Sequence, residues 1–220
     1  MPKIMNVLTS DFETTFWNKG NPFDQRNKAV ALACKQGPNA PHCEFSLEEQ
    51  YDCGFLLDFD LHVFFNAKFD LHWFRKLNYT LPTKIWCCQV AEFVLGGQKE
   101  RFPSLEATAV KYGLGNKIDI IEKEYWSKGV NTDKIPQDIL SDYACQDVDL
   151  TYAVYLKQKE QFDQQPKLYK LFKLMMLDLL VLEEMEWNGL IYDEQLCKHK
   201  SVEIDNKIVQ IKQKLGSYIQ

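Results

Sequence analysis

Acidic residues form three separate clusters in the first 150 residues. Two follow short apolar stretches, and the third lies in a long segment with helical periodicity. These clusters are Asp11-Phe-Glu13, Asn66-Ala-Lys-Phe-Asp70 and Tyr143-Ala-Cys-Gln-Asp147. In α/β folds, side chains that follow different strands meet at one end of the sheet. The spacing therefore predicts an α/β chain that brings four carboxylates together at one end of its sheet.

The first cluster follows residues 4–10, an apolar stretch short enough for a strand. Strand side chains alternate between faces, so Asp11 and Glu13 are expected on one face, at or just beyond the strand's C-terminal end. Asp is disfavoured in strands, so such a pair indicates either a solvent-exposed edge or a cation between the carboxylates. Taken alone, the pair favours the solvent-exposed edge.

The second cluster closes a strand candidate, residues 61–65, and opens a helix. Asn66 has a side chain suited to an N-cap. Asp70 falls in the first helical turn, where a carboxylate complements the helix dipole. This dipole interaction is an alternative to metal binding for Asp70.

The third cluster lies on a predicted helix at residues 136–163. Asp147 is one turn from Tyr143 on the helix's apolar stripe, and an unpaired buried charge costs roughly several kcal/mol. No Lys or Arg stands at positions 140, 143, 144, 150 or 151, so a distant Lys or a metal is required. Asp149 is expected at the solvated surface. The predicted stripe comprises Leu140, Tyr143, Ala144, Val148, Thr151, Val154 and Tyr155.

Four carboxylates on separate elements form the hard oxygen ligand set that Mg²⁺ or Mn²⁺ prefers. Two such ions about 4 Å apart bind the attacking and leaving oxygens of a phosphodiester displacement. The residues therefore indicate a two-metal phosphodiester-cleaving site.

The motif order resembles that of the DnaQ-like, or DEDD, 3′–5′ exonucleases, and the Tyr is typical of the DEDDy branch. Asn66-Ala-Lys-Phe-Asp70 and Tyr143-Ala-Cys-Gln-Asp147-Val-Asp149 are especially similar to the proofreading domain of family A (polymerase I-like) DNA polymerases. The resemblance implies an RNase H-like mixed five-stranded sheet flanked by helices. It also implies release of nucleoside 5′-monophosphates from DNA 3′ ends.

The resemblance implies roles for the matching positions. Asp11, Glu13 and Asp147 would hold the ion that activates the attacking water. Asp11 and Asp70 would hold the ion that stabilises the leaving 3′ oxygen, and Tyr143 would orient or help deprotonate the water. The implied substrate-binding residues are Thr14, Thr15, Asn66 and Phe69.

Residues 168–193 are similar to the segment that leads from the exonuclease into the polymerase domain of family A enzymes. This distinguishes a polymerase-linked nuclease from an RNase D-like exoribonuclease. The alternative is an ordinary helix that stops at Asn188-Gly189. We expect an exonuclease domain at 1–165 and a helical extension at 166–220. A DNA polymerase module, in cis or in trans, is the implied partner.

The charge distribution bears on the substrate. Residues 1–165 carry 18 Lys and Arg against 23 Asp and Glu, and residues 166–220 carry eight of each. The chain lacks the basic footprint of duplex binders. The expected substrate is single-stranded DNA or a frayed primer 3′ end. Four aromatic residues flank the motifs and either stack on bases or pack in the core: Phe12, Phe16, Trp17 and Phe69.

With 45% hydrophobic residues the chain can bury a full core. It has neither an apolar run of about 18 residues nor a signal-peptide pattern, so a cytoplasmic protein without a membrane partner is expected. For a phage-encoded chain this means the host cytoplasm. Seven cysteines without C-x-x-C favour reduced thiols. A zinc set would have poor spacing: Cys34, His42, Cys43 and Cys53.

Two further alternatives remain. Leu56-Leu-Asp58-Phe-Asp60 resembles the Asp-x-Asp of haloacid dehalogenase-type phosphatases, but it lacks their downstream Lys and acidic pair. The second alternative is a non-catalytic module that holds nucleic acid or docks a polymerase. Such a module is expected to have lost one of the four carboxylates, and this chain has all of them.

Element boundaries follow from periodicity and turn signals. Residues 96–103 and 113–133 are expected to be irregular, the second beside the site. Strands are predicted at 4–11, 28–35, 43–46, 61–66 and 84–88, and helices at 47–53, 69–77, 89–96, 104–113, 136–163, 167–188 and 194–218.

Overall fold

The structure is a computed structural model. It describes residues 5–45, 47, 58–99, 101–116 and 120–217. Packing divides the chain into two units, Met1–Glu184 and Met185–Gln220. Residues 48–53 of the first predicted helix lie outside the described residues, as does the start of the Leu56-Leu-Asp58 motif.

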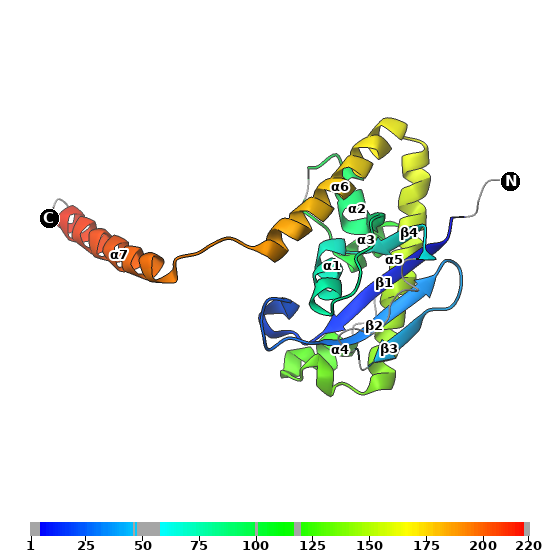
Figure 1. The fold of residues 1–220 in the computed structure, drawn as a ribbon, viewed down its shortest axis with the longest axis horizontal. Coiled ribbons are helices and arrows are strands. Elements are labelled where there is room, and N and C mark those ends of the chain that lie inside the picture. The colour runs from blue at the N-terminus through cyan, green and yellow to red at the C-terminus, as the bar shows by residue number, and fades with distance from the viewer. Residues whose placement is uncertain (1–4, 46, 48–57, 100, 117–119, 218–220) are drawn as a thin grey trace. The chain divides into compact units, whose positions relative to one another are not determined.

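The first unit contains a mixed five-stranded sheet with the order β3-β2-β1-β4-β5. Strand β1 is antiparallel to β2 and parallel to β4, and the sheet forms one layer crossed by the long helix α5 (Figure 1). The predicted mixed five-stranded sheet is therefore confirmed. The strands are β1 (Val7–Thr14), β2 (Ala29–Gln36), β3 (His42–Phe45), β4 (Leu61–Phe64) and β5 (Ile85–Cys87).

Strand β1 extends beyond its predicted end. Asp11 pairs with Ala33 of β2, and Glu13 pairs with Ala31, so both acidic residues lie within the strand. The prediction that the strand closes at Asp11 was wrong, because Phe12 and Thr14 continue the pairing with β2. Backbone pairing with a neighbouring strand thus overrides the low strand propensity of the acidic residues.

Among the described residues, six α-helices surround the sheet or continue from it, and most agree with the predicted ranges to within a few residues. They are α1 (Ala67–Lys76), α2 (Cys88–Leu95), α3 (Leu105–Lys111), α4 (Ile120–Glu124), α5 (Gln137–Asp163) and α6 (Pro166–Asn188).

Residues 113–133 were predicted to be irregular, and this was wrong at residues 120–124. These residues form α4, where Ile121 is fully buried against Leu140 and Tyr143. This tertiary packing is absent from the local pattern, which is too short to show a helical period. Short 3₁₀ turns also lie within the described residues, among them η1 (Trp17–Gly20), η3 (Trp126–Lys128) and η4 (Thr132–Lys134).

The two faces of the sheet pack against different helices. Phe12 of β1 meets Phe74 of α1 edge to face at 5.1 Å between ring centroids. On the other face, Ala33 of β2 packs with Ala144 and Val148 of α5. Small side chains on this strand let the helix approach closely. All seven residues of the predicted α5 stripe are buried, which confirms it.

The first unit includes α6 as far as Glu184, and four side chains of this part are buried. The division predicted between residues 165 and 166 stays a prediction. The second unit contains α7 (Glu194–Gly216), whose Asp193 cap accepts a hydrogen bond from the Leu196 amide. Among the described helices, none combines the length and apolarity needed to cross a membrane.

Candidate active site

Three acidic side chains converge between β1 and α5. Ligand oxygens of Asp11, Glu13 and Asp147 all lie within 4.8 Å of one another. Glu13 and Asp147 are buried, at 6% and 4% exposure, and Asp11 is half-buried. In the described part of the chain, they form the group of three or more His, Cys, Asp or Glu side chains whose ligand atoms lie close enough together to hold a metal ion.

The local structure explains why these residues meet. Asp11 and Glu13 pair with alanines of β2 that share their face, and that face packs against α5. On α5, Asp147 lies one helical turn from Tyr143, and both are buried toward the sheet. The strand pairing shifts register between Glu13 and Thr14. Such bulges re-aim side chains and are common beside active sites.

Asp70 reaches the same end of β1 from the first turn of α1. It is 1% exposed, and its Oδ1 accepts a hydrogen bond from the Phe12 amide at 3.1 Å. Burial raises the pKa of Asp70 well above its usual value, and the neighbouring charge of Asp11 raises it further. Carboxylates crowded in this way repel one another unless a cation or protons offset their charge.

The donor set fits a divalent metal ion. Two oxygens on opposite sides of one Mg²⁺ are about 4.2 Å apart, because each Mg–O distance is about 2.1 Å. The observed spread of up to 4.8 Å is close to this value. All three donors are carboxylates, the ligands that Mg²⁺ and Mn²⁺ prefer.

Tyr143 lies beside this cluster and is 5% exposed. Its ring meets Trp126 edge to face at a centroid distance of 6.1 Å. Burial raises the pKa of the Tyr143 phenol far above its usual value, and the charges of Asp147 and Glu13 add to this effect. The phenol therefore stays protonated at neutral pH and is suited to donate a hydrogen bond.

The four predicted substrate-binding residues fall into two groups. The Thr15 hydroxyl donates to Asn27 Oδ1 at 3.0 Å and accepts from the Lys28 amide at 2.9 Å, so it ties β1 to the loop before β2. Asn66 lies at the N-cap position of α1, where it is exposed and makes no side-chain capping bond. Its amide is therefore accessible from solvent.

Thr14 and Phe69 flank a tight turn. The backbone of Gly20 has a φ of +71°, and a Cβ there would lie 2.7 Å from Thr14 Oγ1 and 3.4 Å from the Phe69 ring. The turn packs directly on both residues, so only glycine fits. Asn18 and Lys19 also have positive φ, and the turn therefore has an unusual left-handed backbone.

Phe16 and Trp17 were predicted from the sequence to flank the site, but the residues that contact Phe16, Trp126 and Asn131, were not predicted. Phe16 packs on Trp17 and Trp126 at centroid distances of 6.4 and 6.3 Å, and its amide donates to Asn131 Oδ1 at 3.0 Å. Trp126 contacts Tyr143 in turn, so the aromatic contacts extend from the candidate site to the exposed Trp17 ring. The signal was hidden because residues 126 and 131 fall in a segment predicted to be irregular.

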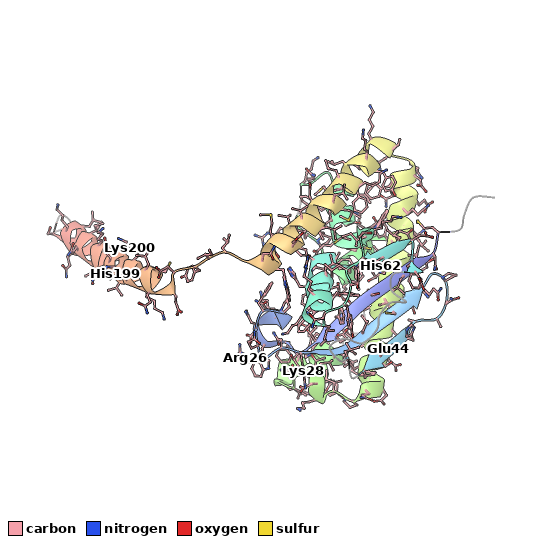
Figure 2. All side chains as sticks on the ribbon, viewed as in Figure 1. Arg26, Lys28, Glu44, His62, His199 and Lys200 are labelled. Carbon is pink, nitrogen blue, oxygen red and sulfur yellow. The ribbon has the colours of Figure 1, made fainter. Side chains whose placement is uncertain are left out.

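Basic residues lie at the same end of the sheet. Arg26 and Lys28 lie where β2 begins, beside the end of β1, whereas His62 lies farther along the sheet (Figure 2). The Arg26 guanidinium is 5.2 Å from the centroid of the exposed Trp17 ring. The Arg26 Nε and Nη2 atoms also donate to the Asp24 carboxylate at 2.9 and 2.6 Å, so what this end offers to a nucleic acid strand is chiefly the exposed Trp17 ring.

Residues of the alternative zinc and phosphatase sites make ordinary contacts within the fold. Cys34 and Cys43 are free thiols, as are the other described cysteines. Cys53 of the zinc set lies outside the described residues. Asp60, from the Asp-x-Asp motif, accepts a hydrogen bond from the Asn6 amide at 3.0 Å just before β4.

Comparison with known proteins gives the following matches. A family model described as a 3′–5′ exonuclease, that of family A DNA polymerases, matches residues 11–163. DNA polymerase DpoZ of Salmonella phage PMBT28 is 27% identical over 154 residues. The matched segment is 66% of this chain but 24% of that protein, so the chain spans about a quarter of this relative.

Two solved structures share the fold. NrnC of Brucella melitensis with bound Mg²⁺ gives a TM-score of 0.67 at 16% identity, over 86% of this chain and 91% of that one. The catalytic core of RRP6 from Trypanosoma brucei gives 0.58 at 16% identity, over 78% of this chain and 46% of that one. The RNase H-like α/β fold is thereby confirmed.

Proposed function

Because the chain belongs to the 3′–5′ exonuclease family of family A DNA polymerases, we propose that it removes nucleoside 5′-monophosphates from DNA 3′ ends. The observation that carries this proposal is the cluster of Asp11, Glu13 and Asp147, whose oxygens lie within 4.8 Å of one another. Buried like charges are costly, and a cation that binds the reacting phosphate accounts for them.

The proposal assigns roles to the residues around this cluster. Asp11, Glu13 and Asp147 would hold one divalent cation, and Asp11 with Asp70 a second. Two such cations, Mg²⁺ or Mn²⁺, supply Lewis acidity that lowers the pKa of water and stabilises a leaving oxygen. Tyr143 donates a hydrogen bond that orients the attacking water.

The substrate groups lie around the same end of the sheet. Thr14, Thr15, Asn66 and Phe69 would line the terminal nucleotide, with Thr15 acting chiefly by fixing the backbone after β1. Trp17 provides an exposed ring on which a base can stack. A binding site for a few nucleotides suits single-stranded DNA or a frayed primer end, because each stacked base contributes about 1–3 kcal/mol to the free energy of binding.

A labelled-strand assay tests the activity. The full chain is incubated with 5′-labelled single-stranded DNA or RNA of the same sequence, with Mg²⁺, Mn²⁺ or EDTA. We expect a ladder that shortens from the 3′ end of DNA and is lost in EDTA and in Asp11→Ala and Asp147→Ala. Asp142→Ala is the matched control, since this carboxylate lies on the exposed side of α5, five residues before Asp147.

The RNA arm tests the second candidate, an RNase D-like exoribonuclease. NrnC has been solved with bound pGG, and this structure resembles the present fold. Faster shortening of RNA than of DNA would replace the deoxyribonuclease assignment with this one. Intact strands under every metal condition, with the chain folded, would leave a module that holds nucleic acid or docks a polymerase.

We further propose a proofreading role beside a polymerase module, in cis or in trans. The support is the likeness to a phage DNA polymerase over residues that are 24% of its length. Proofreading requires preference for a frayed end, because a paired terminus must first unpair. Primers with a matched or a mismatched 3′ nucleotide test this: we expect faster removal of the mismatch, and equal rates would contradict the role.

A further inference from the structure

A pocket of about 360 Å³ opens in the first unit, at the end of the sheet opposite the carboxylates. Leu61 and Ile85, which begin the parallel strands β4 and β5, line it. Because β1 runs parallel to β4, its acidic residues lie toward the other end. The pocket therefore takes no part in the proposed nuclease chemistry.

The floor of the pocket is a closely packed aromatic cluster. Trp86 lies 4.6 Å from Phe172 and 5.0 Å from Tyr155 between ring centroids, and all three are at most 3% exposed. The Trp86 indole N–H donates to Gln158 at 3.1 Å, so it is not presented to a ligand. Since these rings cover one another, they offer little free face on which a base can stack. The floor suits an inserted apolar side chain.

The rim of the pocket is basic. Lys84, Lys159 and Lys173 line it. Lys173 lies over the Tyr169 ring at 4.9 Å, and Lys159 makes a solvent-exposed pair with Asp163 at 3.2 Å. Asp60 is the acidic residue among the lining groups, and its carboxylate accepts the Asn6 amide. Because Lys159 is paired with Asp163, Lys84 and Lys173 supply the positive charge of the rim, and on a chain with a formal charge of −5 they form a local site for carboxylates.

An exposed apolar stripe on α6 continues from the pocket. Leu174, Leu177 and Val181 share one helix face and are 54%, 59% and 58% exposed, and Leu177 also lines the pocket. Contiguous apolar surface of this kind marks interaction sites. A small molecule would fill the pocket alone, whereas a peptide also covers the stripe.

We propose that the pocket and the α6 stripe bind an acidic segment of a partner protein that inserts one bulky apolar side chain. The side chain lies over the Trp86 floor, and flanking carboxylates pair with the lysine rim. The segment's neighbouring apolar residues cover Leu174 and Val181. This inference does not depend on the nuclease activity.

Fluorescence anisotropy with the full chain tests the proposal. The probes are fluorescein-labelled peptides in which one Phe, Leu, Ile or Trp lies within a run of aspartates. We expect at least one to bind with a Kd below about 100 μM, and to weaken at least tenfold when its apolar residue is Ala or its aspartates are lysines. The Lys84→Glu/Lys173→Glu variant should weaken binding by at least tenfold as well. Lys170→Glu, on α6 but outside the pocket lining, is the control.

Methyl NMR spectra locate the bound peptide. Resonances of Ile85 and Leu177 should shift on titration, while Leu140, which packs with Tyr143, should not. The proposal is overturned if no peptide binds below about 1 mM, if the Ala peptide binds equally well, or if the shifts appear elsewhere. A single-stranded oligonucleotide that displaces the peptide and binds more tightly would assign the pocket to nucleic acid instead.

Discussion

The two ends of the sheet are built on opposite principles. Where β1 ends, Asp11, Glu13 and Asp147 crowd their oxygens within 4.8 Å. Where β4 and β5 begin, Trp86 and Phe172 pack at 4.6 Å in an apolar cluster. Like charges destabilise the fold in the absence of a cation, and buried aromatic area stabilises it. The comparison indicates that one end is arranged for chemistry and that the other end supplies the stability this requires.

Removing α6 should have the largest effect, because the aromatic end depends on it. Phe172, Met176 and Leu179 of α6 are buried within the first unit, and each contributes about 1.5–3 kcal/mol to the free energy of unfolding. Together they approach the total stability of an ordinary domain, about 5–15 kcal/mol. We expect a chain ending at residue 165 to be unfolded by circular dichroism, while a chain ending at residue 190 unfolds cooperatively. Cooperative unfolding of the shorter chain would instead support the domain division predicted at 165/166.

The converse is expected at the acidic end, where Asp70→Asn should abolish activity and spare the fold. The amide oxygen can still accept from the Phe12 N–H, whereas the charge that meets the cation is lost. Loss of a group that only supports a metal ligand costs about 10–100-fold, so loss of a direct ligand should exceed a hundredfold. Steady-state rates on single-stranded DNA measure this.

The same variant sharpens the comparison through its stability. In EDTA, Asp70→Asn should melt at or above the temperature of the natural chain, because the amide is neutral, whereas burial and the charge of Asp11 make the Asp70 carboxylate costly to ionise. Asp142→Asn, on the exposed side of α5, should change neither rate nor melting temperature appreciably. A marked drop in melting temperature for Asp70→Asn would show that the carboxylate stabilises the fold.

The sequence predicts the acidic end of the sheet better than the aromatic end. The acidic end was anticipated in its residue types, since Asp11, Glu13 and Asp147 lie on elements whose periodicity is visible in the sequence. The register shift after Glu13 was not anticipated, and neither was the packing of Trp126 on Tyr143. Both arise from contacts between segments far apart in the chain, which local patterns do not encode.

The aromatic end was less predictable. Cys87 and Cys88 were expected to lie together in a strand, but β5 ends at Cys87 and α2 begins at Cys88. The pocket is formed by strand starts, α5 and α6, whose meeting depends on the tertiary fold. The family resemblance predicted the sheet, the order of the motifs and a segment at residues 168–193, but it did not predict that this segment lines a pocket.

Two tryptophans, one at each end, test the comparison directly. Trp86→Ala should lower the free energy of unfolding by about 3–5 kcal/mol, since the ring is 3% exposed and a cavity would remain. Trp17→Ala should leave stability nearly unchanged, because that ring is 47% exposed. It should instead raise KM for single-stranded DNA about tenfold through lost stacking. Urea unfolding and steady-state kinetics on both variants measure this. The division of roles would be contradicted if Trp86→Ala changed KM alone and Trp17→Ala lowered the free energy of unfolding.

The smallest expected effect concerns Glu92, a buried carboxylate in the polar network beneath the aromatic cluster. It accepts from Tyr112 Oη at 2.7 Å and from Gln158 Nε2 at 3.1 Å, and it also pairs with Lys111. Burial raises the pKa of Glu92, but the hydrogen bonds from Lys111, Tyr112 and Gln158 outweigh burial and lower it below 4.5. The ionised form is therefore the one that the fold favours.

The sign of the pH dependence follows from this lowered pKa. A folded-state pKa below the unfolded value gives stability that is present above about pH 4.5 and lost as the pH falls through the folded pKa. At pH 7, Glu92→Gln should cost about 1–2 kcal/mol, and the deficit should shrink in acid. Urea unfolding between pH 3 and pH 7 measures it, with the exposed Glu106→Gln as control. A deficit that stays constant with pH would mean that packing, rather than charge, is what Glu92 contributes beneath Trp86.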